Sequence, residues 1–117
     1  MTDRELLEHA AKAAGIVIKE WDYGEPVVDS TDGNYDFNWN PLTDDGDALR
    51  LAVKLRLHAK HFSPYEDDFD IKPPGMVEVW QEDGEDPLHI EYFKPGDDTY
   101  AATRRAIVRA AAEIGRK

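Results

Sequence analysis

Apolar residues near the start of the chain recur at the spacing of an α-helix. The positions that share one face are Leu6, Leu7, Ala10, Ala11 and Ala14. Thr2 and Glu5 form the T-x-x-E pattern of a capping box, in which each side chain accepts a free backbone N–H at the helix start. Gly15 stands where a glycine commonly ends a helix. We therefore predict a first helix over residues 3–14.

A second helix is predicted in the middle of the chain, over residues 43–55. Thr43 is the expected N-cap, and Asp44, Asp45 and Asp47 follow it in the first turn. The helix dipole favours negative charge at that end. The apolar stripe consists of Ala48, Leu49, Ala52, Val53 and Leu55. Cap, charge and periodicity agree, so this is the best-specified element of the chain.

The stretch between these two helices has the character of β-strands. Residues 16–21 are β-branched and aromatic and predict a strand, and residues 26–28 are a candidate for the short opposing arm of a hairpin. Tyr35, Phe37 and Trp39 alternate with polar residues, so a strand would place the three rings on one face. We expect these rings to fill the core.

Three further strands follow the second helix. Residues 57–62 alternate in character, and residues 76–80 and 88–92 flank an Asp-Gly pair that is typical of a hairpin turn. The positions expected to face the core are Val77, Val79, Leu88, Ile90 and Tyr92. Residues 63–75 are rich in acids and prolines, which predicts a loop.

A last helix is predicted at the end of the chain. Asp97 or Asp98 is the expected cap, and Gly115 is expected to end the helix. The residues that share its apolar face are Tyr100, Thr103, Ile107, Ala110, Ala111 and Ile114. The whole order of elements is therefore α-β-β-α-β-β-β-α.

This order predicts an α+β fold. We expect one small sheet of four to five strands, antiparallel or mixed, packed by three helices. The 117 residues fit a single domain spanning residues 1–117. Hydrophobic residues make up 41% of the chain, which is enough for one core.

The charge balance restricts the expected partners. There are 25 acidic residues against 14 basic ones, and the net charge is -11. This argues against broad binding to nucleic acids or anionic membranes, which needs clustered Lys and Arg. Cysteine is absent, so disulfides and thiolate chemistry are excluded. The charged start lacks the apolar segment of a signal peptide, and no apolar run could span a membrane. We therefore expect a cytoplasmic protein.

Three stretches of the sequence carry specific patterns. They are E-L-L-x-x-A-A-x-A-A-G-I at residues 5–16, W-N-P-x-x-D-D-G-D-A-x-R-L-A-V-K-L at residues 39–55, and A-T-R-R-A-I-V-R-A-A-A-E-I-G at residues 102–115. Together they resemble a family of small phage and prophage proteins of unassigned function. The plan is also similar, more loosely, to phage proteins described as an α-β-α sandwich domain. The resemblance implies helices covering a small sheet and a bacterial host, and it implies no activity.

The sequence does not contain the common motifs of catalysis or cofactor binding. Ser30 and Ser63 lie in no nucleophile elbow, and neither a P-loop nor a G-x-G-x-x-G loop occurs. The four histidines are scattered, and a zinc site would need further ligands. The aspartates at the start of the second helix invite a metal interpretation, but adjacent carboxylates that enter a helix point in different directions. We therefore expect no enzyme, no cofactor and no metal.

Two groups of interaction candidates flank the start of the second helix. Trp39 and Asn40 form a turn that offers a recognition surface, although Trp39 more simply fills the core. Asp44 and Asp45 stand beside this turn, where they cap the helix or contact a partner.

Two further groups lie in the second half of the chain. Asp67 and Asp68 belong to an acidic loop whose carboxylates could imitate DNA phosphates on a basic host protein, a device that phage-encoded inhibitors use. Arg105 and Arg109 give the last helix a basic side, which contacts phosphate or complements the protein's own acids. The leading hypothesis is a non-enzymatic accessory protein that contacts a host or phage protein, in one version as an acidic inhibitor. The alternative is a nucleic-acid-associated protein that uses the basic helix.

Overall fold

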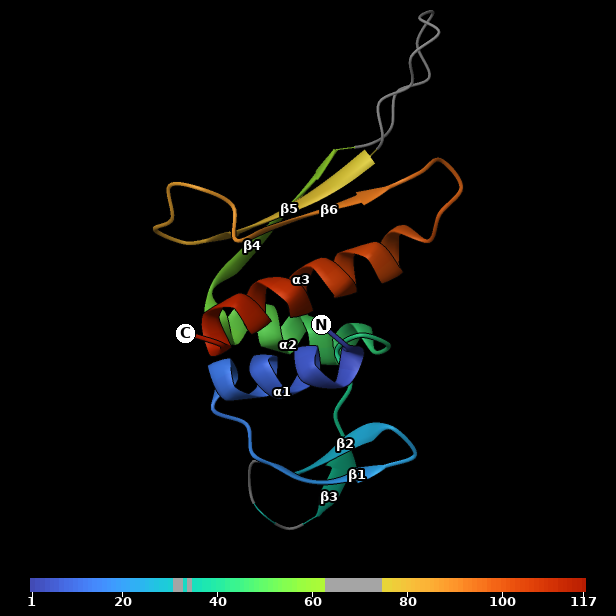
Figure 1. The fold of residues 1–117 in the computed structure, drawn as a ribbon, viewed down its shortest axis with the longest axis vertical. Helices are drawn as coiled ribbons and strands as arrows, with labels where there is room; N and C mark the ends of the chain where they lie inside the picture. The colour runs from blue at the N-terminus through green and yellow to red at the C-terminus, as the bar shows by residue number, and fades with distance from the viewer. Residues whose placement is uncertain (31–32, 34, 63–74) are drawn as a thin grey trace, which may run out of the picture.

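The computed structural model describes residues 1–30, 33, 35–62 and 75–117. Its elements are α1 (Asp3–Ala14), β1 (Ile18–Asp22), β2 (Glu25–Asp29), β3 (Asp36–Asn38), α2 (Asp45–Leu55), β4 (Leu57–Phe62), β5 (Gly75–Gln81), β6 (His89–Phe93) and α3 (Thr99–Gly115). In Figure 1 the three helices form the middle of the molecule, with β1–β3 on one side of them and β4–β6 on the other. The architecture is a sheet, a layer of helices and a second sheet.

Two three-stranded sheets take the place of the single sheet that the sequence predicted. The first sheet has the strand order β1-β2-β3 and the second has the order β4-β5-β6. All four strand pairs are antiparallel. The fold is α+β, but the expectation of one sheet with four to five strands is wrong. Strands that are consecutive in the chain pair within each sheet, and the helices separate the two sets.

The first helix has the bounds and the caps that its sequence predicts. Thr2 Oγ1 accepts the backbone N–H of Glu5, and a Glu5 carboxylate oxygen accepts the backbone N–H of Thr2, both at 3.2 Å. The Glu5 carboxylate accepts hydrogen bonds from the Thr2 backbone N–H and, at 3.0 Å, from the Thr2 hydroxyl, and these two bonds hold the pKa of the Glu5 carboxyl below its ordinary value. At the other end Gly15 adopts a left-handed conformation with φ 71°. Local capping thus specifies α1 completely.

The caps of the other two helices follow the sequence closely, with one difference at the start of α2. Asp44 caps α2 in place of Thr43, because the Asn40 carbonyl oxygen already accepts the N–H groups of both Thr43 and Asp44 in the preceding turn. Asp98 caps α3, as one of the two expected candidates. Gly115 is the last residue of α3, as expected, and Arg116 follows it as the cap in a right-handed conformation.

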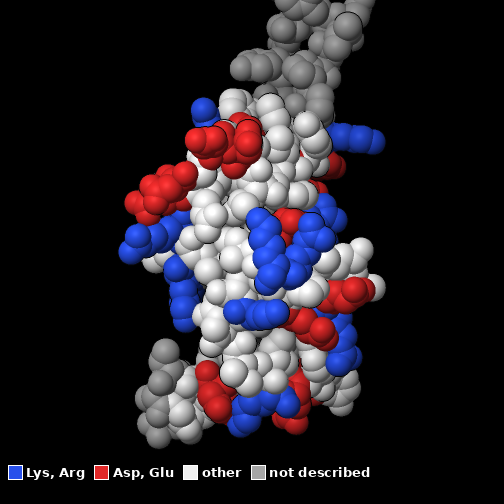
Figure 2. All heavy atoms as spheres, turned by 60° about the vertical axis from the view of Figure 1, so that its left-hand side comes forward, with Lys and Arg blue, Asp and Glu red and all other residues white. Residues whose placement is uncertain are grey.

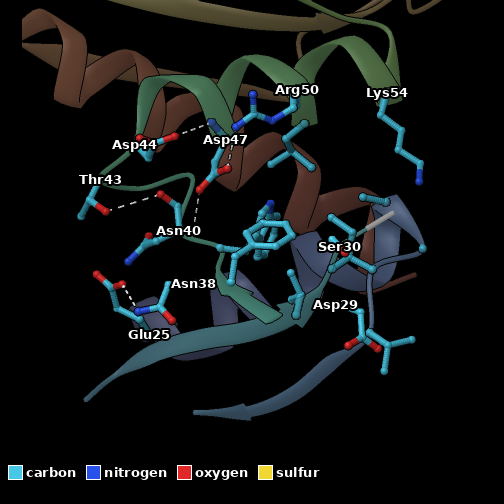
Figure 3. Close-up of a pocket in the computed structure, with 18 of the residues that line it drawn as sticks. Glu25, Asp29, Ser30, Asn38, Asn40, Thr43, Asp44, Asp47, Arg50 and Lys54 are labelled. Carbon is cyan, nitrogen blue, oxygen red and sulfur yellow. Dashed lines mark hydrogen bonds and ion pairs between the residues drawn. The ribbon is translucent and has the colours of Figure 1, made fainter. Parts of the chain in front are cut away.

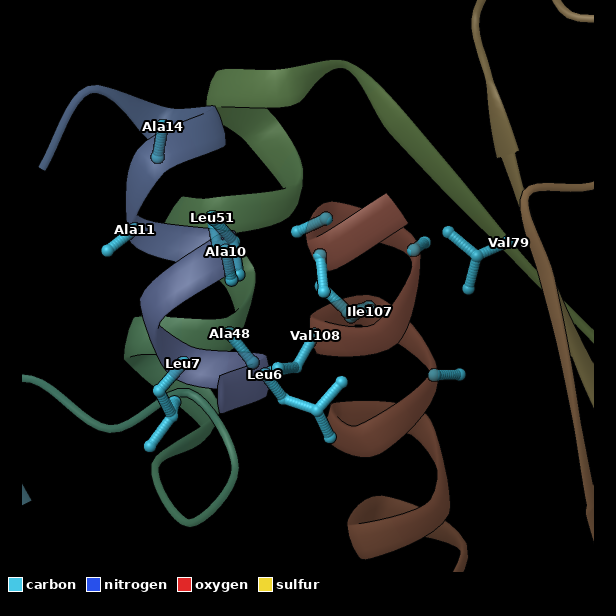
Figure 4. Packing of buried hydrophobic residues seen from close by; sticks show 14 of the residues in the cluster. Leu6, Leu7, Ala10, Ala11, Ala14, Ala48, Leu51, Val79, Ile107 and Val108 are labelled. Carbon is cyan, nitrogen blue, oxygen red and sulfur yellow. The ribbon is translucent and has the colours of Figure 1, made fainter. Parts of the chain in front are cut away.

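The core forms where α1 packs against α3 through small side chains (Figure 4). The buried hydrophobic residues of these two helices are Leu6, Leu7, Ala10, Ala11, Ala14, Ala106, Ile107, Val108, Ala110, Ala111 and Ala112. A Cβ atom on Gly115 would overlap the carbonyl oxygen of His9, so only glycine allows the two backbones to approach this closely. Gly115 therefore serves helix packing at the position where α3 ends.

Several apolar residues expected on buried faces are exposed. Leu49 and Val53 point to solvent, because α2 turns Ala48 and Leu51 into the core. Tyr100 is exposed in the first turn of α3, ahead of the buried run that begins at Ala106. The predicted helical spacing is confirmed in these two helices, but the predicted apolar face lies about one residue away from the face that is buried.

The second sheet turns one face toward α3. Val77 and Val79 are completely buried on that face, as predicted. Tyr92 was expected beside them and is exposed, because it pairs with Met76 in the opposite row of the sheet. Phe93 is the buried aromatic residue of β6. The loop predicted over residues 63–75 lies outside the described residues, except for Gly75 at the start of β5.

Candidate binding cleft

A cleft of about 1150 Å³ lies between the first sheet and α2. In Figure 3 Arg50 and Lys54 project from α2 on one side of it, while Glu25 and Asn38 lie on the first sheet across from them. The end of α1 and the turn that follows it close one side of the cleft, through Ala14 and the residues after it. The end of α1, the first sheet and α2 thus meet at one concave surface.

A network of hydrogen bonds around Asp47 holds the end of the cleft where α2 begins. The Asp47 side chain is 9% exposed, and its Oδ2 accepts the backbone N–H of Asn40 at 3.0 Å. Its Oδ1 accepts a hydrogen bond from Arg50 Nη2 at 3.0 Å. Its own N–H donates to Asp44 Oδ2 at 2.8 Å, and Asn40 Oδ1 accepts the Leu42 N–H at 3.0 Å. The turn into α2 is therefore rigidly tied to the first turn of the helix.

The remaining aspartate of this segment points away from the cleft. Asp45 Oδ1 lies 2.7 Å from Arg104 Nη1 of α3, and the same guanidinium donates through Nε to the carbonyl oxygen of Leu42 at 2.9 Å. The carboxylates at positions 44, 45 and 47 thus each bond different groups and do not converge on one point. Within the described residues, no group of three or more His, Asp or Glu side chains is arranged to hold a metal ion.

Aromatic rings form one wall of the cleft. Tyr35, Phe37 and Trp39 all line it, which agrees with the shared face that their alternation predicts. Trp39 is 4% exposed, but Tyr35 and Phe37 are 63% and 36% exposed, so the expectation that all three fill the core is wrong. The rings of Tyr35 and Phe37 lie 6.1 Å apart at 50°. The helices cover this face only at Trp39, and the cleft leaves the other two rings open to solvent.

Basic side chains form the opposite wall. Arg50 and Lys54 are one turn apart on α2, so they lie on the same side of the helix. Arg50 uses Nη2 to bond Asp47 and remains 73% exposed. Lys54 is exposed and has no hydrogen bond or ion pair with any residue in the described part of the chain. It is therefore available to a ligand.

The carboxylates of the first sheet that border the cleft already have partners within the protein. Glu25 accepts a hydrogen bond from Asn38 Nδ2 at 3.1 Å. Lys19 Nζ donates to Asp29 at 3.1 Å and to Asp36, just outside the cleft, at 2.9 Å. The hydrogen bond from Lys19, and then one with Asp29, hold the pKa of the Asp36 carboxyl below its ordinary value. Glu25 thus bonds a neutral amide, and Asp29 and Asp36 share the one ammonium of Lys19, so the charge of these acids is only partly compensated.

Three of the residues expected to mediate interactions meet at this cleft, namely Trp39, Asn40 and Asp44. Trp39 is buried beneath it, while Asn40 and Asp44 organise the turn at its edge. Asp45 lies on the other side of this segment, against α3. Asp67 and Asp68 lie outside the described residues.

The basic residues of α3 are bonded to carboxylates of the same chain. Arg105 Nη1 lies 3.1 Å from Asp3 Oδ1, and Arg109 Nη1 lies 2.7 Å from Glu91 Oε1. The sequence left this pairing open as one of two interpretations of the basic helix side. Figure 2 shows a face on which basic and acidic side chains alternate, so the acidic excess does not form one continuous surface there.

Neither wall of the cleft was identified from the sequence alone. Tyr35 and Phe37 were assigned to the core, and Arg50 and Lys54 of the second helix were not among the interaction candidates. One signal could have found the basic wall, because these two cations stand four residues apart on a predicted helix. No local signal shows that the helix would face an aromatic strand.

The cleft does not combine the groups that nucleophilic catalysis uses. No histidine is among the described residues that line it. Ser30 lines it and is buried, and its hydroxyl oxygen accepts the backbone N–H of Tyr35 at 3.3 Å. Two histidines bond elsewhere, His61 with Thr103 and His89 with Glu91.

Comparison with known proteins yields no relative for this chain. No family model matches it, and neither a curated protein nor a solved structure matches it. Among the described residues, no helix is both long enough and apolar enough to cross a membrane. The cleft is therefore the feature of the molecule from which a function can be proposed.

Proposed function

We propose that this protein is a non-enzymatic accessory protein that acts by binding a segment of another protein in the cleft. The observation that carries this proposal is the pairing of two open aromatic rings, Tyr35 and Phe37, with an unpaired cation at Lys54 across one concave surface. Rings left open to water beside a cavity gain free energy when a ligand covers them. Aromatic and basic residues of this kind are enriched where protein interfaces carry most of their binding energy.

The phage or prophage setting of this proposal comes from the three motifs that resemble phage proteins of unassigned function. The structure gives architectural roles to the central motif, because Trp39 is buried and Asp47 bonds the backbone of Asn40. The motif thus supports the rim of the cleft, and Tyr35 precedes it in the sequence. A partner from the host or from the phage is consistent with such an arrangement.

The nucleic-acid alternative has less support. Arg104, Arg105 and Arg109 of α3 each bond a carboxylate of the same chain, so their charge is already compensated. Electrostatic binding to phosphates requires cations that can release counterions from the nucleic acid. Charge reversal at Arg105 should abolish any salt-dependent mobility shift with DNA if this alternative is correct.

Site-specific crosslinking in bacterial host cells tests the proposal. A photoreactive phenylalanine at Phe37 should crosslink one partner protein, because this ring lies in the cleft. The same group at Tyr23 is the control, since Tyr23 is fully exposed on the β1–β2 turn and does not line the cleft. The crosslink from position 37 should disappear in Lys54→Glu. Equal crosslinking from positions 37 and 23, or none from position 37, would refute the proposal.

A further inference from the structure

The last strand of the second sheet turns two polar residues toward the helices. Glu91 of β6 lies against α3, where its Oε1 is 2.7 Å from Arg109 Nη1 and 2.8 Å from His89 Nε2. Because side chains alternate along a strand, Ile90 and Tyr92 point to the opposite side, away from α3. Tyr92 is accordingly 62% exposed. This arrangement reverses the usual pattern of an antiparallel sheet, in which the apolar row faces the core and the polar row faces water.

The neighbouring strands continue this apolar row across the sheet. The register pairs Met76 of β5 with Phe62 on one side and with Tyr92 on the other, and Trp80 lies on the same face farther along β5. In Figure 1 all three helices lie on the other side of this sheet. We call this surface the outer face; its apolar members are Phe62, Met76, Trp80, Ile90 and Tyr92. Within the described part of the chain, none of the five packs against the main core.

One carboxylate stands among these apolar side chains without a partner. Glu78 lies between Met76 and Trp80 on the outer face, and its side chain has no hydrogen bond or ion pair with any described residue. Lys60 is its cross-strand neighbour, but Lys60 Nζ lies 5.2 Å from the centre of the Phe62 ring. A carboxylate next to an aromatic side chain is suited to an ammonium or guanidinium group, which gains an ion pair and a ring contact together.

The turn between β5 and β6 adds negative charge at the Trp80 end of the outer face. Its acidic residues are Glu82, Asp83, Glu85 and Asp86. Glu82 is paired with Arg56 at 3.5 Å, whereas the other three have no ion pair among the described residues. The remaining cations are Lys60, over its aromatic ring, and Lys94, at the opposite end of β6. The Trp80 end of this surface is therefore acidic.

We infer that the outer face of the second sheet binds a basic segment of a partner protein. Apolar residues of this segment cover Ile90 and Tyr92, one Arg or Lys bonds Glu78 beside Trp80, and further cations lie along the acidic turn. The net charge of -11 favours encounter with a basic partner and opposes association of two copies of this chain. An acidic or neutral segment would cover Glu78 without pairing it, which costs free energy.

This surface is separate from the cleft and does not rest on the function proposed for it. The cleft is lined by the first sheet, α2 and the end of α1. The second sheet lies on the other side of the helices from the first sheet (Figure 1). Both surfaces can therefore be occupied at the same time, and the protein would then connect two partners.

Selection of short random peptides on the immobilised full-length protein tests this inference. Peptides that also bind the Tyr92→Ser protein are removed, and those that remain should be enriched in Arg or Lys next to apolar residues. Glu78→Lys should weaken their binding about tenfold or more in fluorescence anisotropy, because it replaces an attraction by a repulsion. Glu20→Lys is the matched control, since it makes the same charge change at an exposed position on β1, outside the cleft. Its effect should stay below about twofold.

A second pair of variants tests the apolar contact. Ile90→Ala should weaken peptide binding about tenfold, whereas Leu49→Ala, at an exposed position on α2, should leave it unchanged. Lys54→Glu in the cleft should also leave it unchanged. The inference is overturned if no peptide is selected, if the peptides lack Arg and Lys, or if Glu78→Lys and Glu20→Lys weaken binding equally. The crosslink from Phe37 decides the proposed function independently of these results.

Discussion

The carboxylate of Asp47 in α2 accepts the backbone N–H of Asn40, two residues after the end of β3, at 3.0 Å. This bond connects the first sheet to the helix that faces it across the cleft. Asp45 is only two residues away in the sequence, but its side chain is 71% exposed and bonds Arg104 of α3. Two identical side chains in one helical turn therefore contribute very differently to stability.

Asp47→Ala should destabilise the protein by about 2–3 kcal/mol, because it leaves the partly buried Asn40 N–H without its acceptor. Asp45→Ala should cost less, about 1 kcal/mol, because the Asp45 carboxylate itself is exposed although its partner Arg104 is mostly buried. Urea denaturation followed by circular dichroism measures both values. Similar losses in the two variants would contradict the assignment of Asp47 as the structural residue.

Replacement of Gly115 should be costly although alanine is the better helix former. The added Cβ would overlap the carbonyl oxygen of His9, so α1 and α3 would have to move apart. We expect Gly115→Ala to destabilise the protein by about 3 kcal/mol, in the range of an overpacked core. Glu113→Ala on the same helix is the control, with an expected change below about 1 kcal/mol. A stabilised Gly115→Ala protein in thermal denaturation would disprove the close contact.

Replacement of the two leucines near the middle of α2 by alanine should affect stability to very different extents. Leu51 is 2% exposed and Leu49 is 64% exposed. Leu51→Ala should cost about 2–5 kcal/mol, whereas Leu49→Ala should change stability by less than about 0.5 kcal/mol. Urea denaturation of both variants measures the difference. If Leu49→Ala were the more damaging, the orientation of α2 would be wrong.

The Lys19–Asp36 pair should make stability depend on pH at both ends of the scale. Its hydrogen bond lowers the pKa of Asp36, so this contribution is present above the ordinary carboxyl pKa and is lost as pH falls through the lowered value. Hydrogen bonds to Asp36 and then Asp29 raise the pKa of Lys19, so that contribution is lost as pH rises through the raised value.

Titration of the carboxyl carbons by NMR checks this assignment. In Lys19→Met the pKa of Asp36 should rise toward its ordinary value. Lys12→Met, on α1, should leave it unchanged. An unaltered Asp36 titration in Lys19→Met would show that the ammonium does not contact this carboxylate in solution.

Local sequence patterns correctly predicted those features that depend on residues close together in the chain. The capping box of Thr2 and Glu5 and the left-handed Gly15 specify α1, because all of their partners lie within the same helix. The burial of Val77 and Val79 in the core follows from the strict alternation of apolar and polar residues in β5. The aspartates of α2 were correctly interpreted as helix-start residues, and only the choice of Asp44 over Thr43 differed.

Features that depend on distant parts of the chain could not be predicted in this way. The alternation of Tyr35 and Phe37 shows that they share a face, but whether a helix covers that face depends on where α2 packs. In the same way, six strands can pair in one sheet or in two, and short-range signals do not distinguish these outcomes. The cleft, which exists only between separate elements, therefore became visible only in the structure.

The packing of α1 on α3 has a consequence for synthesis in the cell. These helices are far apart in the sequence, so α3, which covers Leu6 and Ala10, is translated long after α1. Until α3 leaves the ribosome, the apolar side of α1 has no native surface to cover it, and long-range closure makes this step slow compared with helix formation. A nascent chain of this protein should therefore depend on chaperones until α3 emerges.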